Sequence, residues 1–317
     1  CPTLTDRDIA AAAQEAVSEL LEGGYRPEII FLFAEVGWSY DCLKEHKQTL
    51  LDGGLRWIQA ASSGAEKLCP IWVGSEVVCT NGAGIYASTL AEFCLGSILH
   101  FVKHFPRLHS QKERRVWQMR DDDSVPPDDV EGKTVLIAGY GATGAATARL
   151  AQAFGMRTVG VKREPKPEDF DFADELISPT PKPALLQALG QADYVVCALP
   201  KTEETHHFFG APEFAAMKSS AIFVNVGRGD NCDEHALAAA LRSGELRGAA
   251  LDVFEEEPLP TESELWALEN LLLSPHATDM TVNYPTKSAK LFAANLRRYR
   301  ESGLADLANT VDLVRGY

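Results

Sequence analysis

The sequence lacks an excess of basic residues: 45 acidic side chains stand against 30 basic ones, and the formal net charge is -15. A surface of this charge repels phosphate backbones and anionic membranes, so we expect no nucleic acid partner. Long apolar runs are also lacking, since none approaches the ~18 residues that a membrane helix needs. The first residues show no basic-then-apolar signal pattern. We therefore expect no membrane partner either.

Paired cysteines are missing as well. The seven cysteines are odd in number and scattered, without a C-x-x-C pair. Free thiols in a reducing compartment fit this pattern better than a disulfide framework, so the expected location is cytoplasmic. His100 and His104 are four residues apart, as in metal-binding helical pairs, but no acidic residue lies between them as in H-E-x-x-H. We expect no metal.

A glycine motif is the most informative feature that is present. In KTVLIAGYGATG, Lys133 to Gly144, an apolar run ends in glycines at G-x-G-x-x-G spacing and leads into the helix-forming stretch Ala145 to Phe154. Gly139 allows a tight turn, Gly141 allows the backbone to approach a pyrophosphate, and Gly144 allows the helix to pack close to the strand. The helix N-terminus offers N–H groups to the phosphates. The motif predicts a dinucleotide site.

Strand and helix patterns alternate along most of the chain, and 317 residues favour two domains. The nearly all-apolar strands joined by helices predict parallel sheets covered on both faces, an α/β fold with doubly wound sheets. The predicted strands are Ile29 to Phe33, Leu55 to Ala60, Thr158 to Val161, Tyr194 to Leu199, Ala221 to Val226, Ala249 to Phe254 and Leu271 to Leu273. The predicted helices are Thr5 to Leu21, Leu43 to Leu51, Pro183 to Leu189, Pro212 to Met217 and Glu234 to Arg242.

Three polar residues follow predicted strands, where ligands of open α/β sheets bind. They are Arg228 in NVGRGD, Glu257 in LDVFEEEP and His276 in LLLSPHATD. Each alone could be an ordinary ion-paired, solvated or hydrogen-bonded side chain. Together they supply what hydride transfer to a ketone needs: a proton donor, a group that keeps the donor charged, and a cation for a substrate carboxylate.

Several motifs in this order resemble the D-2-hydroxyacid dehydrogenase family. They are the SSGA turn at Ser62 to Ala65, TLAEF at Thr89 to Phe93, GYGATG, ALPKTEET at Ala198 to Thr205, NVGRGD, ALDVFEEEPLP and SPH. The resemblance implies an NAD(P)-dependent oxidoreductase, a 2-ketoacid reductase that interconverts 2-keto and D-2-hydroxy acids. Thr278 and Asp279 follow the histidine where many members have small residues or glycine. In this the sequence resembles a glyoxylate/hydroxypyruvate reductase-like branch of the family.

The resemblance also implies roles for particular residues. Arg228 would bind and polarise the 2-keto acid, His276 would be the general acid, and Glu257 would orient its imidazole. Substrate carboxylate would meet backbone amides at Ser63, Gly64 and Ala65. The residues expected to contact the cofactor are Thr89, Gly139, Tyr140, Gly141, Ala142, Thr143, Gly144, Leu199, Pro200, Thr205, Val226, Gly227 and Asp252, the last near the nicotinamide.

The coenzyme preference follows from the end of the second strand of the dinucleotide-binding domain. Enzymes that use NAD carry an acidic residue there, whereas GMRTVGVKREPKP has Lys162 and Arg163. Two cations suit a 2′-phosphate, so we expect NADP(H) to be preferred. They could also be ordinary surface cations, and Glu164 could reach a ribose, so NAD(H) stays possible.

The expected architecture is two Rossmann-like domains with the cleft between them. Residues 1–99 with 287–317 would form the substrate-binding, flavodoxin-like domain, and residues 100–286 the dinucleotide-binding domain. Relatives begin with a strand before the first helix, so the smaller domain is expected to lack its first strand. The segment Thr89 to His109 is expected to contribute to a homodimer, as it does in the family.

A second function class stays open at this stage. Some proteins similar in fold are corepressors that use the dinucleotide to control assembly, and they can retain the catalytic trio. They usually carry disordered tails, which this sequence lacks, so an enzyme is the favoured interpretation. Formate dehydrogenase is disfavoured because that branch lacks the glutamate matching Glu257. Phosphoglycerate dehydrogenase is disfavoured by Lys162 and Arg163 and by the absence of a regulatory domain after Tyr317.

Overall fold

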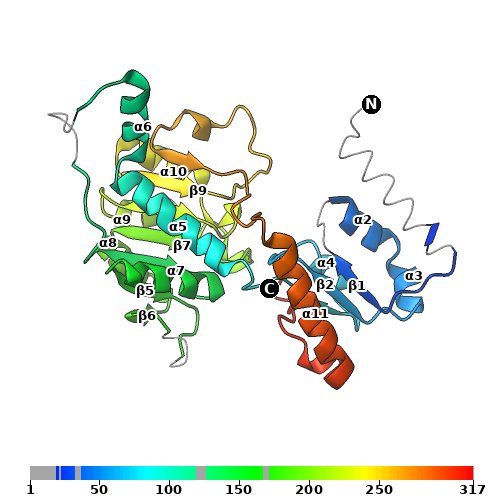
Figure 1. The fold of residues 1–317 in the computed structure, drawn as a ribbon. Coiled ribbons are helices and arrows are strands. Elements are labelled where there is room, and N and C mark those ends of the chain that lie inside the picture. Colours follow the sequence, from blue (N-terminus) through cyan, green and yellow to red (C-terminus); the bar gives the residue numbers. More distant parts are fainter. Residues whose placement is uncertain (1–18, 21–22, 33–36, 119–125, 167–170, 317) are drawn as a thin grey trace, which may run out of the picture. The chain divides into compact units, whose positions relative to one another are not determined.

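The structure is a computed structural model that describes residues 19–20, 23–32, 37–118, 126–166 and 171–316, with only the backbone described for 37–39. The chain divides into two compact units, one of residues 1–85 with 282–317 and one of residues 86–281 (Figure 1). Most of the predicted helix Thr5 to Leu21 lies outside the described residues. Each unit is an α/β structure built on a parallel sheet, as predicted.

The larger unit contains a seven-stranded sheet in the order β10-β9-β8-β7-β4-β5-β6, with every neighbouring pair parallel. Its strands are β4 (Thr134–Ala138), β5 (Arg157–Val161), β6 (Glu175–Ile177), β7 (Tyr194–Cys197), β8 (Ile222–Asn225), β9 (Gly248–Leu251) and β10 (Leu271–Leu273). The chain winds outward in one direction from β4 through β5 and in the other from β7. This reversal is the point at which open α/β sheets bind ligands.

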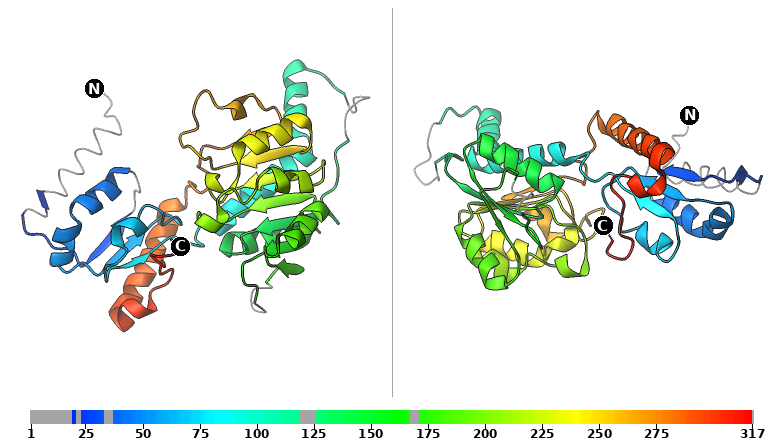
Figure 2. Two further views of the ribbon diagram at one scale, coloured as in Figure 1. Left: turned by 180° about the vertical axis from the view of Figure 1, so that it is seen from behind. Right: turned by 90° about the horizontal axis from the view of Figure 1, so that it is seen from below.

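Helices cover both faces of this sheet, as Figures 1 and 2 show. Because successive strand side chains point to opposite faces, Leu136 and Val195 join one apolar core while Ile137 and Val196 join the other. The first core packs under α8 (Lys182–Gln191), α9 (Ala211–Ala216) and α10 (Glu234–Ser243); the second packs under α5 (Ala87–Val102) and α7 (Ala142–Ala153). The helix α6 (Phe105–Arg114) and the short helices η2 (Glu203–Thr205), η3 (Gly229–Asn231) and η4 (Glu264–Ala267) complete the unit.

The smaller unit has a three-stranded parallel sheet in the order β1-β2-β3. Its elements are β1 (Ile29–Leu32), α2 (Gly37–Glu45), α3 (Lys47–Asp52), β2 (Trp57–Ala60), α4 (Cys69–Trp72), β3 (Val78–Thr80), α11 (Tyr284–Ser302) and η5 (Gly303–Asp306). Ile58 packs with Leu43, Leu50 and Trp72 on one face. Phe292 of α11 stacks on Phe31 at 4.4 Å between ring centroids.

The last helix is fastened to this sheet by a buried amide. Asn295 is fully buried, and its Nδ2 donates to Oε1 of Gln59 at 2.8 Å, while its Oδ1 accepts the N–H of Ala308 at 2.9 Å. The two chain segments of the unit, separated by almost 200 residues in the sequence, therefore share one polar core.

Predicted elements and observed ones agree closely at the sheet. Every predicted strand overlaps an observed one, although β7, β8 and β9 end before the predicted Leu199, Val226 and Phe254. The helix predicted from Leu43 to Leu51 is divided between α2 and α3 at His46, although the N–H of His46 still bonds to the carbonyl of Cys42 at 3.0 Å. The sequence pattern gave no prediction for β6 or α11: no residue of β6 is buried, and the buried residues of α11 are the polar Ser288 and Asn295.

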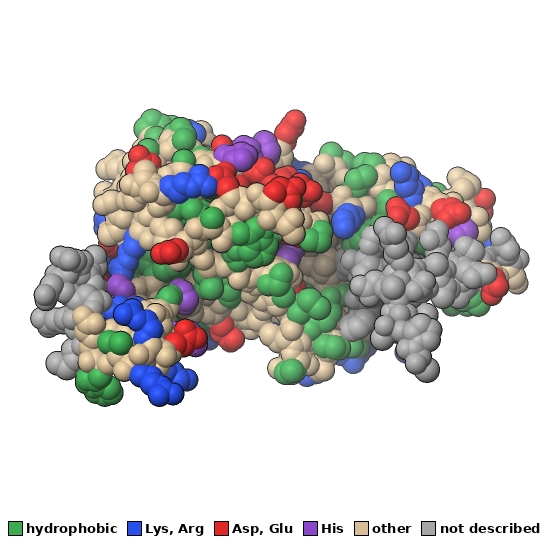
Figure 3. Space-filling model, turned by 90° about the horizontal axis from the view of Figure 1, so that it is seen from above, with side chains coloured by type: hydrophobic (Ala, Val, Ile, Leu, Met, Phe, Trp, Pro, Cys, Tyr) green, Lys and Arg blue, Asp and Glu red, His purple; other side chains and the backbone are tan. Residues whose placement is uncertain are grey.

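The unit boundaries, after residue 85 and before 282, lie earlier in the chain than the predicted 99 and 287. The physical reason is α5, whose Cys94, Ile98 and Val102 are buried in the same core as Val135 and Ile137 of β4. Among the described residues, no helix has both the length and the apolar character needed to cross a bilayer. On the face drawn in Figure 3, the basic side chains form small separate groups among acidic and apolar ones.

Candidate active site

The predicted functional residues of the larger unit lie in the loops that leave its strands. The glycine motif follows β4, Leu199 and Pro200 follow β7, and Arg228 follows β8. Asp252 and Glu257 follow β9, and His276 follows β10. Because all of these strands are parallel, their carboxyl ends lie along one edge of the sheet. The fold thus brings these separate sequence segments to one edge.

His276 and Glu257 form a direct pair. The imidazole Nδ1 lies 2.7 Å from Oε2 of Glu257, within hydrogen-bonding distance. The other carboxylate oxygen of Glu257 accepts the N–H of Phe254 at 3.0 Å, which fixes the carboxylate from its own loop. His276 has a φ of 51°, in the left-handed region that few non-glycine residues adopt. With Nδ1 directed at the carboxylate, Nε2 remains for a proton transfer.

Electrostatics favours the charged form of both partners. The pKa of His276 is raised above its ordinary value, chiefly by the hydrogen bond with Glu257, against the opposing effect of burial. Burial acts to raise the pKa of Glu257, but the hydrogen bonds from His276 and Phe254 and the charges of His276 and Arg228 outweigh it, so that this pKa is lowered. The arrangement therefore favours an imidazolium next to a carboxylate.

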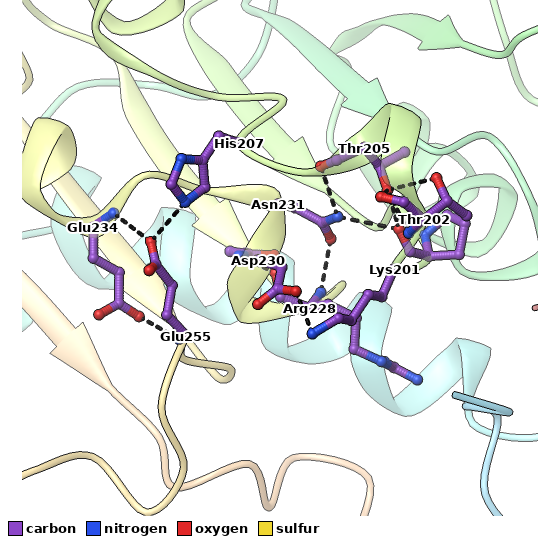
Figure 4. Close-up of polar contacts among 11 residues, drawn as sticks. Lys201, Thr202, Thr205, His207, Arg228, Asp230, Asn231, Glu234 and Glu255 are labelled. Carbon is purple, nitrogen blue, oxygen red and sulfur yellow. Dashed lines mark hydrogen bonds and ion pairs between the residues drawn. The ribbon is translucent and has the colours of Figure 1, made fainter. Parts of the chain in front are cut away.

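Arg228 belongs to the same electrostatic group. The charge of its guanidinium helps to lower the pKa of Glu257. The same charge partly opposes the rise in the pKa of His276. The backbone N–H of Arg228 donates to Oδ1 of Asn231 at 2.8 Å (Figure 4). Its Nη1 donates to the carbonyl of Gly227 at 2.7 Å. A fixed cation near the imidazole is suited to a substrate carboxylate.

Asp252 fastens the loop that carries His276. This carboxylate is only 2% exposed, and its Oδ1 accepts a hydrogen bond from the Ser274 hydroxyl at 2.6 Å and from the Ala277 N–H at 3.1 Å. Its Oδ2 accepts from the Thr278 hydroxyl. Sequence reasoning placed Asp252 near the cofactor but missed these contacts, because nothing in the local sequence joins residue 252 to residues 274–278.

The glycine loop has the geometry expected of a tight strand-to-helix turn. Gly139 has a φ of 94°, and a Cβ there would lie 2.4 Å from the carbonyl oxygen of Ala198. A Cβ on Gly144 would lie 2.5 Å from the carbonyl oxygen of Gly139, so the helix can approach the strand only with glycine here. A Cβ on Gly141 would meet nothing within 4 Å. Its approach to a pyrophosphate stays a prediction.

The other predicted cofactor residues are distributed around this edge. Thr89 lies in the first turn of α5, Ala142 and Thr143 begin α7, and Val226 and Gly227 follow β8. Thr205 is turned inward, where its hydroxyl donates to the carbonyl of Pro200 at 2.7 Å. The Tyr140 hydroxyl donates to the carbonyl of Asp171 at 2.7 Å.

Lys162 and Arg163 follow β5, the strand next to the glycine-motif strand. The Arg163 guanidinium contacts the Glu204 carboxylate at 3.0 Å, and both side chains are exposed. Two cations are therefore present at the position where the sequence predicted a 2′-phosphate, with an acidic neighbour on η2.

The predicted substrate-carboxylate turn belongs to the smaller unit. Ser63, Gly64 and Ala65 come shortly after β2. Ser63 donates through its hydroxyl to the carbonyl of Gly82 at 3.2 Å, and its own carbonyl accepts from Nδ2 of Asn81 at 2.8 Å. These bonds hold the turn in shape within its own unit.

A pocket of about 630 Å³ opens beside the histidine pair. Its lining is mainly apolar, with His276 and Glu257 among the few polar groups. The lining residues are Phe254, Glu257, Pro258, Leu259, Trp266, Leu273, Ser274, Pro275 and His276. Small-molecule sites commonly combine such an apolar wall with a few convergent polar groups.

Comparison with known proteins places this geometry in a family. A sequence model described as "D-isomer specific 2-hydroxyacid dehydrogenase, NAD binding domain" matches residues 95–278. The chain is 44% identical over 225 residues to a glyoxylate reductase of Thermococcus gammatolerans, covering 70% of this chain and 66% of that protein. The match thus spans just under two thirds of that relative.

Two solved structures extend the likeness over nearly the whole chain. A D-isomer specific 2-hydroxyacid dehydrogenase family protein from Aeromonas salmonicida has a TM-score of 0.78 and 31% identity, covering 96% of this chain and 88% of that one. A D-isomer specific 2-hydroxyacid dehydrogenase from Xanthobacter autotrophicus, in complex with NADPH and MES, has a TM-score of 0.74 and 26% identity, with coverages of 92% and 100%. The chain therefore belongs to the D-isomer specific 2-hydroxyacid dehydrogenase family.

Proposed function

We propose that this protein is a 2-keto acid reductase, an oxidoreductase that acts on small 2-keto acids and their D-2-hydroxy counterparts with NADP(H) preferred. The observation that carries the proposal is the 2.7 Å contact between His276 and Glu257, near the charge of Arg228, on the edge where the dinucleotide motif ends. The similarity to a glyoxylate reductase supports a small 2-keto acid as the substrate.

The glycine loop fits a nicotinamide dinucleotide. Any side chain at Gly139 or Gly144 would collide with backbone oxygens, and the N-terminus of α7 has no side chain capping it. Its N–H groups can therefore bind a pyrophosphate. When bound, the reduced dinucleotide would supply the hydride.

The side chains of this chain would perform the remaining steps. The protonated imidazole of His276 donates a proton to the carbonyl oxygen of the substrate, which becomes the hydroxyl of the product. Glu257 holds the imidazole by Nδ1, so that Nε2 carries the proton to be transferred. Arg228 binds the substrate carboxylate and stabilises negative charge that develops on the carbonyl oxygen.

A spectrophotometric screen tests the proposal. Glyoxylate, hydroxypyruvate, pyruvate, and branched and aromatic 2-keto acids are each offered with NADPH and with NADH. We expect turnover with at least one acid and a higher kcat/KM with NADPH. Dinucleotide binding without turnover of any acid would instead favour the corepressor-like alternative.

We also propose a homodimer in a reducing compartment, the cytoplasm. The helix α6 exposes Phe105 and Leu108, two large apolar side chains that an interface could cover. The six cysteines in the described ranges are free and buried, which suits a reducing environment. Fractionation of the source cells would check the compartment.

A further inference from the structure

A second histidine and carboxylate pair lies two residues before Glu257. Nε2 of His207 is 3.1 Å from Oε1 of Glu255, and the same oxygen accepts the backbone N–H of Glu234 at 3.2 Å. In return, the backbone N–H of Glu255 donates to Oε1 of Glu234 at 2.7 Å. Figure 4 shows these three residues together; Glu234 begins α10, whereas His207 lies in the loop after η2 and Glu255 in the loop after β9. We call His207, Glu234 and Glu255 the clasp.

Two residues of the clasp, His207 and Glu234, are held in place by their neighbours. Glu234 is the first residue of α10, and His207 comes just after η2, whose Thr205 is buried and bonded to Pro200. The backbone N–H of His207 donates to the carbonyl of Asp230 at 2.7 Å. His207 has a φ of 46°, a conformation that a non-glycine residue keeps only where its surroundings hold it.

The third residue of the clasp, Glu255, belongs to the loop that carries Glu257. This loop is fixed at its start by Asp252, which bonds to residues 274–278, and at its middle by Glu255. Glu257 itself is held by the N–H of Phe254, the residue next to Glu255. Because only Glu256 separates the anchored Glu255 from Glu257, a small shift at Glu255 displaces the carboxylate that contacts His276.

Direct charge effects do not link the clasp to the imidazole. The charged groups that act on His276 are Glu257, Asp252, Arg228 and Asp279, none of which belongs to the clasp. We propose that His207 and Glu255 are positioning residues that hold the Glu257 carboxylate within hydrogen-bonding distance of His276. The expected effect on kcat rests on the proposed function, whereas the expected effect on the pKa of His276 does not.

Imidazole NMR titration of the full chain tests the inference without turnover. The His276 signal is assigned from its loss in His276→Ala, and Glu257→Gln sets the largest effect that loss of the pair can have. In His207→Ala and Glu255→Ala we expect the pKa of His276 to fall by about half a unit or more toward its ordinary value. His207→Gln and Glu255→Gln retain a donor and an acceptor, so we expect them to keep the wild-type pKa.

His235→Ala is the matched control. It removes another exposed histidine and carboxylate pair, with Nδ1 of His235 2.6 Å from Oε1 of Glu264, and leaves the clasp bonds in place. Thermal unfolding is measured for every variant. An unchanged His276 pKa in both clasp alanine variants would overturn the inference, whether or not they unfold at lower temperature, because the clasp would then be only structural.

Kinetics provides a second readout. If the wild type reduces a 2-keto acid, Glu255→Ala should lower kcat roughly tenfold, short of the 10² to 10⁴ expected for loss of the acid itself, and leave the KM for NADPH unchanged. A rise in that KM with constant kcat would contradict positioning of Glu257. Absence of wild-type turnover would refute the proposed function, while the NMR titration would still decide on the clasp.

Discussion

At the scale of single residues, the proposed chemistry depends on the hydrogen bond between His276 and Glu257. The bond between His276 and Glu257 is present in a partly exposed setting, where solvent screens charge. Its importance therefore lies in orientation and protonation state rather than in stability. The proton donor and the pH dependence of the proposed reaction follow from this bond. The coenzyme preference follows from Lys162 and Arg163, the cations after β5.

Replacing His276 with alanine removes the only proton donor that the proposed mechanism uses. We expect kcat for keto-acid reduction to fall by about 10² to 10⁴, with the affinity for NADPH little changed because the proposed dinucleotide site is the glycine loop. Steady-state kinetics and fluorescence titration measure the two effects. Turnover within about threefold of the wild type would show that His276 is not the general acid.

The pH dependence of reduction should follow the protonated imidazole. The pKa of His276 is raised, so activity should persist at pH values above the ordinary histidine range and be lost as pH rises through that raised pKa. In Glu257→Gln the raising effect is lost, and the decline should move to lower pH. Profiles of kcat/KM against pH measure the shift, and identical profiles for the two proteins would be incompatible with the assigned pair.

Coenzyme preference should depend on Lys162 and Arg163. Replacing both with alanine should lower kcat/KM for NADPH roughly tenfold or more, as expected for loss of charged hydrogen bonds, and change that for NADH little. Arg157→Ala is the control, since Arg157 is an exposed cation at the opposite end of the same strand and pairs with Glu175. A wild-type enzyme that prefers NADH would refute the assignment outright.

At the scale of elements, the turn between β4 and α7 is constrained by close backbone contacts. Gly139 lies beside the carbonyl of Ala198 at the end of β7, and Gly144 lies over Gly139. These contacts set the distance between α7 and the centre of the sheet. They are required by the fold even before a ligand is considered.

Gly139→Ala should therefore destabilise the protein beyond the effect of its backbone angle. The angle alone is expected to cost about 1 to 3 kcal/mol, and the collision with Ala198 adds to it. Gly132→Ala isolates the angle, because Gly132 has a φ of 75° and nothing within 4 Å of its added Cβ. Denaturant unfolding measures both variants, and equal losses would show that the contact with Ala198 is unimportant.

At the scale of the whole molecule, the chain leaves the smaller unit at residue 85 and returns to it at residue 282. The returning segment is secured by Asn295 and by the backbone bond from Val311 to Cys79 at 2.8 Å. Each unit thus has its own core, and the larger one carries the histidine pair entirely within itself.

The assembly should be a dimer that depends on α6. We expect light scattering at micromolar concentration to give twice the chain mass, and Leu108→Asp to shift the protein toward monomer, because it places a charge on an exposed apolar position of that helix. Val314→Asp alters an even more exposed apolar residue outside α5 and α6 and should have no effect. A monomeric wild type would remove this proposal.

Local patterns and one topological rule were enough to predict the sheet of the larger unit and the edge on which its candidate functional residues lie. Apolar strands alternating with helices determine a parallel sheet, and in such a sheet Arg228, Glu257 and His276 must follow strands on one edge. Glycine spacing likewise predicted the turn at Gly139, because only a residue without a Cβ fits there.

Only the tertiary structure decided which side chains meet. The bonds of Asp252 to Ser274 and Ala277, of His207 to Glu255 and of Asn295 to Gln59 join residues that lie 22 to 236 positions apart. The same applies to α5, most of which the predicted boundary at 99 gave to the smaller unit, whereas its packing against α7 and β8 assigns it to the larger one. Hydrophobic periodicity reports the face a residue buries, whereas its partner depends on how the whole chain packs.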